Sequence, residues 1–361
     1  MTKQPRSHRL KWVVLVISVT IPLLLWMDHR CSFDELEAIA LDVSSGLGFV
    51  TRNTGVVIVD INDHDYKDLF QGQSPLNPAI LIELVDAIAK AKPKAIGVDI
   101  VTDPAVWTTI QAPSNIPIVW AYRPDNPEGK SLPPTDTAWG SPKWPTNGPV
   151  VRQYLRLVPC QDNQCPSLAW EIMKKGFPNS GLEENNEELT IRFIRGQNVV
   201  HASDVLRLAN APNWGQTGSP LWSKTVVLGG TYNDAHETPL GRMPGVEIWA
   251  NILETEIDGG GYRSPPWIVL LILGLVESIL LVCLLQFWDF KRGLLISVVS
   301  VPFLSITLSW MVYHSAQRWA YFAMILVTLI AEQCIEVARV QQNEQIGEFF
   351  NDLRKGPHES G

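Results

Sequence analysis

Several polar residues that could bind a ligand follow three apolar runs of the sequence, at the points where those runs end. They are Asp60, Asp63, Asp99, Asp103, Asn233, Asp234 and His236. Carboxylate and imidazole groups suit a small cationic or hydroxylated ligand, and carboxylates also suit hard metal ions such as Mg²⁺ or Ca²⁺. The competing interpretation is structural, because Asp and Asn also form turns and caps where strands end.

The apolar runs predict a β-α-β unit that would bring these side chains together. Residues 56–61 (VVIVDI) and 95–101 (AIGVDIV) are continuous β-branched runs typical of buried parallel strands. Between them, residues 78–91 place apolar side chains at helical spacing, with Pro78 at the start and Pro93 after the end. Parallel strands joined by a helix form a right-handed crossover, and ligands bind beyond the carboxyl ends of such strands. If the strands are neighbours, we expect the acids to converge at one edge of the sheet.

The middle section as a whole predicts an α/β domain with a mostly parallel sheet and crossover helices. Further strands are expected at residues 116–122, 189–194 and 226–229, further helices at 202–209 and 246–256, and a loop at 124–149. Pro244 is expected as the first residue of the last helix, because proline lacks the N–H that would be unsatisfied there.

Four apolar segments near the two ends of the chain have the length, or nearly the length, that a membrane crossing requires. They are residues 12–27, 267–288, 294–313 and 319–338. Tryptophans stand at the ends of these segments, where the headgroup region favours an amphipathic ring. We therefore expect four transmembrane helices flanking a folded domain of residues 29–264.

Basic residues predict how these segments are oriented in a bacterial inner membrane. Residues 1–11 carry lysines and arginines but no acid, which places the amino terminus in the cytoplasm. Four crossings then place residues 29–264 outside the cytoplasm and the tail of residues 339–361 inside. A cleaved signal peptide is the competing interpretation of residues 12–27, but no small-residue cleavage site follows them.

Cys160 and Cys165 flank a short loop (QDNQ) in the part of the chain that is expected outside the cytoplasm. An oxidising compartment favours a disulfide between them. The bond would close only a short loop and would add little more than local rigidity. The alternative is a metal site with two thiolates, but no pair of histidines lies nearby in the sequence to complete four ligands. We expect the disulfide and no metal.

Charge and motif content argue against several classes of function. The net charge of −8 argues against a nucleic-acid-binding protein, which needs a basic face. A transporter is disfavoured, because the expected spans carry a single interior acid, Glu277, with Glu332 at the periphery, and show no inverted repeat. A membrane-tethered periplasmic hydrolase is the alternative from the enzyme class, although no nucleophile elbow or Ser-His-Asp grouping is recognisable.

Three stretches of the sequence together resemble the second type of the CHASE extracellular sensory domain, including its setting of one span before and three after. The resemblance covers roughly residues 10–335, and the third stretch is the most specific. The stretches are VVIVDIND with KPKAIGVDI (residues 56–63 and 92–100), GPVVRQYLRLVPC with PSLAWEIM (148–160 and 166–173), and VVLGGTYNDAHETPLGRMPGVEIWANILET (226–255).

The resemblance implies a ligand- or stress-sensing module of bacterial signalling proteins. In that family a kinase, a nucleotide cyclase or a related output domain usually follows the last span. Here residues 339–361 contain no histidine phosphorylation box and no glycine-rich nucleotide-binding loop. We therefore expect a membrane sensor or adaptor, not an enzyme, that relays an unidentified signal from a small molecule or stress to a separate cytoplasmic partner. A homodimer is expected by analogy with membrane sensors, and no cofactor is expected.

The tail places Ile346, Phe349 and Leu353 at a three-four spacing typical of one face of a helix. This pattern predicts either a short coiled pairing or partner contact, or an amphipathic helix resting on the membrane surface. The sequence leaves both interpretations open.

Overall fold

The computed structural model describes residues 55–100, 116–123, 138–145, 149–160, 163–194, 196–232 and 234–261. All of them belong to the unit formed by Ser45–Arg263. Within this part of the chain, no helix combines the length and the apolar character needed to span a membrane. The four expected spans, the tail, Asp103 and Asn233 lie outside the described residues.

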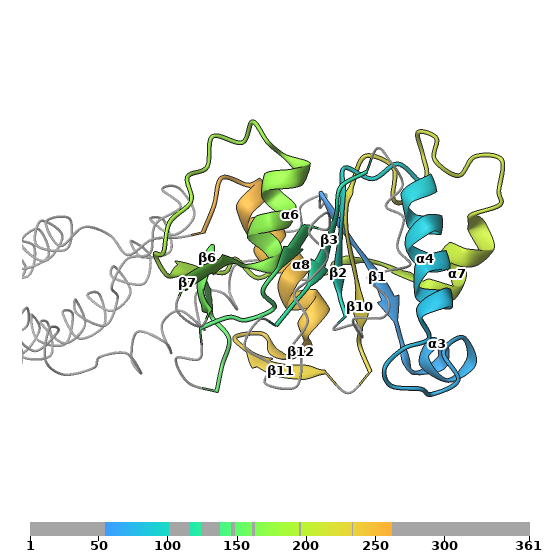
Figure 1. Ribbon diagram of the computed structural model, residues 1–361, viewed down its shortest axis with the longest axis horizontal. Coiled ribbons are helices and arrows are strands. Elements are labelled where there is room, and N and C mark those ends of the chain that lie inside the picture. The colour runs from blue at the N-terminus through green and yellow to red at the C-terminus, as the bar shows by residue number, and fades with distance from the viewer. Residues whose placement is uncertain are drawn as a thin grey trace, which may run out of the picture. The chain divides into compact units, whose positions relative to one another are not determined.

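A six-stranded sheet lies at the centre of the described residues (Figure 1). All of its strand pairs are parallel. In spatial order the strands are β4 (Ala138–Gly140), β3 (Ile118–Ala121), β2 (Ala95–Asp99), β10 (Thr225–Gly230), β1 (Val56–Ile61) and β9 (Asn198–His201). The sheet confirms the expected α/β class with a mostly parallel sheet.

The order of the strands makes the three acid-bearing strands neighbours. β1 and β2 are joined in sequence through the helix α4 (Pro78–Lys90), but β10 lies between them and pairs with both. Asn77 caps α4 by accepting a hydrogen bond from the backbone N–H of Ala79, 3.0 Å away. The acids that follow β1, β10 and β2 therefore start from one edge of the sheet.

Helices cover both faces of the sheet (Figure 1). One face packs against α4 and α7, and the other against α6 and α8. The bounds of these three further helices are Ala202–Leu208 for α7, Leu168–Gly176 for α6 and Gly245–Ile257 for α8. Along β1, Val56 and Ile58 belong to the core on the α6 and α8 face, whereas Val57 and Val59 belong to the core on the opposite face. Burial on both faces explains why the strand is a continuous apolar run.

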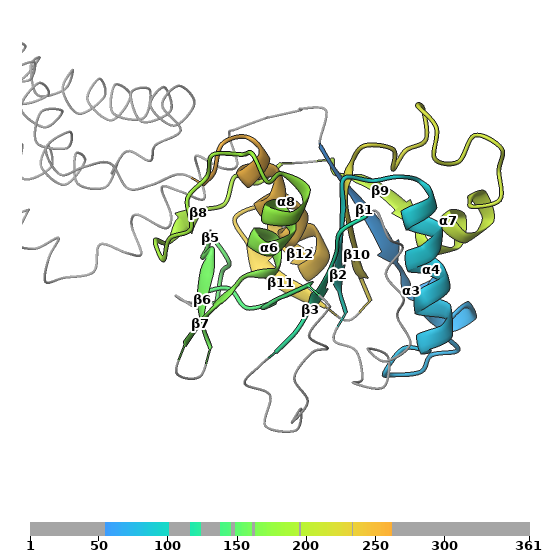
Figure 2. The same ribbon diagram turned by 45° about the horizontal axis from the view of Figure 1, so that its top comes forward.

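Short elements complete the described residues, and their positions are visible in Figure 2. Three antiparallel pairs lie beside the main sheet: β5 with β8, β6 with β7, and β11 with β12. The bounds of the paired strands are Gln153–Tyr154 for β5, Leu189–Thr190 for β8, Leu157–Cys160 for β6, Asn163–Pro166 for β7, Ala235–Thr238 for β11 and Gly241–Pro244 for β12. The short helix α3 (Asp63–Asp68) follows β1.

The expected loop at residues 124–149 was wrong in one part, because β4 lies within it and extends the sheet beyond β3. The segment is rich in proline and glycine, which hides a strand of such short length. Gly140 is required by packing, since a Cβ there would lie 2.5 Å from the Cα atom of Leu168. The glycine that indicated a loop therefore allows α6 to begin against the sheet edge.

The strand expected at residues 189–194 is shorter than predicted and ends at Thr190. Beyond that point, side chains of α8 take the place of a neighbouring strand. The backbone N–H of Arg192 donates to Thr255 Oγ1 over 3.0 Å, and that of Ile194 donates to Asn251 Oδ1 over 2.7 Å. These bonds explain why α8 buries polar residues on an otherwise apolar face.

A buried ion pair joins α8 to the segment between β5 and β6. Arg156 is 3% exposed and Glu256 is fully buried, and two nitrogens of the guanidinium contact the two carboxylate oxygens at 3.0 and 2.9 Å. The hydroxyl of Tyr154 donates to Glu256 Oε1 over 2.5 Å and accepts from the N–H of Gly261. The Arg156 guanidinium also stacks on the ring of Trp170. The pair thus fixes the carboxyl end of α8.

Candidate functional site

The end of the sheet places two carboxylates in one row under the start of α8. In the register of the sheet, His201, Asp60, Gly229 and Asp99 lie side by side on β9, β1, β10 and β2. A Cβ on Gly229 would lie 2.8 Å from Val246 of α8. The glycine therefore lets the helix begin directly above the row, between the two acids. We call this row, together with Thr231, Asp234, His236 and Glu247, the carboxyl edge.

Asp60 is held by side chains from two other segments. Its Oδ1 accepts a hydrogen bond from the hydroxyl of Thr231 over 2.7 Å, and its Oδ2 lies 3.4 Å from Nδ1 of His201. The same imidazole nitrogen lies 3.1 Å from the amide nitrogen of Asn62. Burial raises the pKa of Asp60, while the contacts with Thr231 and His201 lower it and the charge of Asp65 raises it.

Asp99 has the largest resolved change in acidity among the acids of the carboxyl edge. Burial raises its pKa to about 7, and the negative charge of Asp234 acts in the same direction. Arg123 and a hydrogen bond from the side chain of Trp249 oppose this change. Asp99 therefore exchanges its proton near neutral pH.

Asp234 and His236 form a pair at the start of α8. Oδ1 of Asp234 lies 2.8 Å from Nε2 of His236. A Cβ on Gly245, the first residue of α8, would collide with the other Asp234 oxygen, so this carboxylate lies against the helix N-terminus. The α8 N-terminus has Pro244 as its cap residue and no side-chain cap bond. The carboxylate of Asp234 therefore supplies negative charge where the helix dipole favours it.

Pro244 was expected as the first residue of α8 but precedes it by one position. It is both the last residue of β12 and the cap residue of the helix, with an extended backbone (φ −61°, ψ 149°). Gly245 is the first helical residue instead, because the carboxylate of Asp234 occupies the space of a side chain there.

Glu247 in the first turn of α8 adds a further carboxylate to the edge. Burial raises its pKa, and the charge of Asp60 raises it further. On the other side of the helix start, the ring of Trp144 meets the ring of His236 edge-on at 4.9 Å and lies 5.0 Å from the ring of Trp249. The edge therefore combines acids with an aromatic wall.

The predicted site residues have different outcomes. Asp60, Asp99, Asp234 and His236 lie at the carboxyl edge as the sequence predicted, whereas Asp63 is exposed on the first turn of α3. Among the described residues, Asp63 makes no hydrogen bond or ion pair with those four. In the same part of the chain, no three potential metal ligands lie close enough to share an ion.

The comparisons with known proteins identify the family. The CHASE2 domain family matches residues 13–287, well over half of the 361-residue chain. The chain belongs to this family. The match confirms the resemblance found in the sequence and extends across the first expected span and nearly all of the second. No curated protein and no solved structure matches the chain.

CHASE2 domains are extracellular sensory domains. In this CHASE2 chain the carboxyl edge is formed mainly by the third stretch that carries the resemblance, which provides Gly229, Thr231, Asp234, His236 and Glu247. Among the described residues, no serine, threonine or cysteine side chain bonds to His201 or His236. The contacts of the two histidines are therefore with carboxylates, an amide and an aromatic ring.

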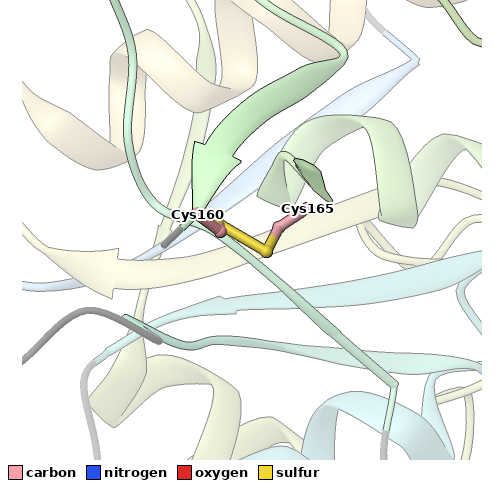
Figure 3. The surroundings of a disulfide bond; sticks show 2 residues. All are labelled: Cys160 and Cys165. Atoms are coloured by element: carbon pink, nitrogen blue, oxygen red, sulfur yellow. A yellow bond between two sulfur atoms is a disulfide. The ribbon is translucent and has the colours of Figure 1, made fainter. Parts of the chain in front are cut away.

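A disulfide links Cys160, the last residue of β6, to Cys165 on β7, within the hairpin that these two strands form (Figure 3). Their Cα atoms are 5.8 Å apart, within the usual range for such a bond. Both cysteines are buried, together with Val158. The bond lies on a different segment from the carboxyl edge and fastens a surface hairpin.

Replacing both cysteines by serine should lower the free energy of unfolding by about 2 kcal/mol or less, because the bond closes a short loop. Urea titration of the full-length protein, with and without the replacement, measures this loss. Mass spectrometry of protein alkylated in intact cells should find the two cysteines joined and not alkylated. Free thiols at both positions would contradict an oxidising location.

Sequence reasoning missed several residues of the carboxyl edge. The sequence predicted Glu247 only as a residue at the start of a helix, and Thr231 only as a residue after a strand. His201 ends β9, a strand that the sequence did not predict, so its place in the row was hidden. The usable signal was the histidine itself, directly before the predicted helix of residues 202–209.

Proposed function

We propose that this chain is an integral membrane sensor or adaptor whose extracytoplasmic domain detects a signal and relays it to a separate cytoplasmic partner. The observation that carries the proposal is the CHASE2 match over residues 13–287, because this family is an extracellular sensory one. The match also includes apolar segments on both sides of the α/β unit. We call residues 29–264 the sensory domain.

The proposed membrane arrangement follows the apolar segments and their flanking charges. Spans at residues 12–27, 267–288, 294–313 and 319–338 place the sensory domain outside the cytoplasm and both termini inside. The disulfide supports this placement, since such bonds persist in the periplasm and are rare in the cytoplasm.

The proposed sensory site is the carboxyl edge, for four physical reasons. It stands beyond the carboxyl ends of neighbouring parallel strands, where ligands of such sheets bind. It gathers acids from β1, β2 and α8. Burial raises the pKa of three of them, Asp60, Asp99 and Glu247, and such groups cluster at functional sites. Finally, α8 begins at this edge, and its last turn carries Glu256 of the buried Arg156–Glu256 pair. The second expected span begins at residue 267, after the end of this helix.

The proposed route to the partner passes through the segment after residue 338. Ile346, Phe349 and Leu353 are spaced so that a helix would present them on one face. An apolar stripe of this kind suits either a second copy of the chain or a helix of the partner. The relay therefore requires this stripe, and the sensory domain alone does not suffice.

The partner is tested by affinity purification of the full-length protein in nanodiscs, followed by mass spectrometry. We expect a cytoplasmic signalling protein to be enriched with the wild-type chain. The same protein should be lost when Ile346, Phe349 and Leu353 are replaced together by serine. A matched control replaces the polar residues Gln341, Gln342 and Asn343 by serine and should retain the partner. Identical sets of purified proteins from both variants would contradict the proposed relay.

A further inference from the structure

Three carboxylates from three different elements meet around the end of β1. Asp60 is the last residue but one of the strand, Asp65 lies in α3 and Glu247 lies in the first turn of α8. Asp60 is 5% exposed, Asp65 is 2% exposed and Glu247 is half-buried. α3 and α8 both pack against β1. Burial is the first cause that raises the pKa of Asp60 and of Glu247, and the charge of Asp65 acts in the same direction on Asp60, as the charge of Asp60 does on Glu247.

One oxygen of the Asp65 carboxylate lacks a partner among the described residues. Its Oδ2 atom is buried and, among the described residues, accepts no hydrogen bond. The backbone N–H of Asp65 donates to the side chain of Asn62, the cap residue of α3. The unsatisfied atom of this residue is therefore an oxygen of its side chain. A buried carboxylate oxygen without a donor is costly. Such groups usually mark a place where a water, an ion or a ligand binds.

No basic side chain balances these acids. Within the described ranges, neither a lysine nor an arginine forms an ion pair with Asp60, Asp65 or Glu247. The one imidazole that contacts them is that of His201, whose side chain is half-exposed. Several acidic side chains therefore gather in a largely buried place, and among the described residues only the imidazole of His201 faces them as a possible positive group. A positive charge from outside the chain would relieve this repulsion.

Two stacked aromatic rings belong to the segments that carry Asp65 and the hydroxyl partner of Asp60. Tyr66 follows Asp65, and its ring stacks on that of Tyr232 with the centroids 4.1 Å apart. Tyr232 follows Thr231, whose hydroxyl binds Asp60. Carboxylates beside aromatic rings are the surroundings that organic ammonium groups favour, because both attract a weakly hydrated positive charge.

We propose that the end of β1 is a subsite for the ammonium group of a small organic cation, with Asp60, Asp65 and Glu247 as its carboxylate partners. The proposal deepens the sensory function and rests on it, since it names the class of molecule that the carboxyl edge detects. An organic cation fits better than a metal ion. A metal ion needs several ligands in one tight shell, and the described residues offer no such group. An ammonium group on a carbon chain can reach acids that lie further apart.

The test uses full-length protein in nanodiscs and titrates it calorimetrically with butylamine and putrescine. Butanol serves as an uncharged probe of the same chain length. We expect saturable binding of the amines and none of butanol. Asp65→Asn should weaken amine binding about tenfold or more, the usual effect of losing one charged hydrogen bond. Asp63→Asn is the matched control on the same helix and should bind like the wild type. Absence of saturable amine binding, or equal affinity in the Asp65 variant, would overturn the proposal.

Stability separates a binding role of Asp65 from a structural one. If Asp65 is an uncompensated charge, Asp65→Asn should leave the urea midpoint of the protein unchanged or raise it. A lower midpoint would make Asp65 a structural residue and overturn the subsite. A stoichiometric response to Mg²⁺ or to acid alone, without amine binding, would do the same. Purification of the cytoplasmic partner uses a different readout, so the proposed relay and the subsite can fail separately.

Discussion

Replacing Arg156 by methionine should lower the free energy of unfolding by about 3–5 kcal/mol, the usual cost of removing one partner from a buried ion pair. The loss is large because the fully buried carboxyl group of Glu256 would be left without its guanidinium partner. The hydroxyl of Tyr154 would remain as its donor, but it is neutral. The urea concentration at which a brief protease pulse cleaves the sensory domain, in full-length protein, measures the change.

Two further variants test the explanation of this loss. Arg207→Met removes an arginine of an exposed ion pair with Asp204 and should cost less than about 1 kcal/mol. Adding Glu256→Gln to Arg156→Met removes the unpaired charge and should recover part of the stability. An equal cost for Arg156→Met and Arg207→Met would show that the buried pair does not stabilise the end of α8.

Replacing Asp99 by asparagine should stabilise the folded protein at about pH 8 by on the order of a few kcal/mol. In the folded protein the pKa of Asp99 is about 7, raised from an ordinary value of 3.8. Because the folded state holds the proton more tightly, the wild-type protein should lose stability as the pH rises from about 4 to about 7. Above that range the effect of Asp99 on the free energy of unfolding should stay constant. The asparagine variant should lack the loss of stability between about pH 4 and about pH 7 that Asp99 causes.

Urea midpoints measured across this pH range check the prediction, and two variants serve as comparisons. Asp86→Asn changes an exposed acid on α4 and should leave the pH dependence as it is in the wild type. Asp234→Asn removes the charge that, after burial, raises the pKa of Asp99. This variant should therefore lose stability at lower pH than the wild type does. Loss of stability in Asp99→Asn at about pH 8 would contradict the account, because the charged carboxylate would then be a favourable partner.

Much of the fold could be predicted because its signals are local. The burial of β1 and β10 follows from their continuous apolar, β-branched sequences. The start of α4 follows from its proline, and its buried face follows from the helical spacing of its apolar residues. β4 and β9 could not be predicted, since they are short and their strand character comes from pairing with a neighbour. The early end of β8 likewise depends on α8, whose side chains accept hydrogen bonds from the backbone N–H groups of Arg192 and Ile194.

The candidate site was predictable only in part, for a related reason. Residues near the carboxyl ends of predicted strands, such as Asp60 and Asp99, can be placed at one edge once the sheet is known to be parallel. Asp63 was misplaced because one residue of helix α3 is enough to turn a side chain away from the edge. Asp65 and Glu247 come from helices whose approach to β1 is a matter of packing, and no sequence spacing reports it.

The placement of the sensory domain outside the cytoplasm is the claim on which this account depends, and reporter fusions test it most directly. Alkaline phosphatase fused after residue 150 should be active, and a green fluorescent reporter after residue 5 or residue 361 should be fluorescent. Fusions that place residue 150 on the same side of the membrane as residue 5 would contradict the account.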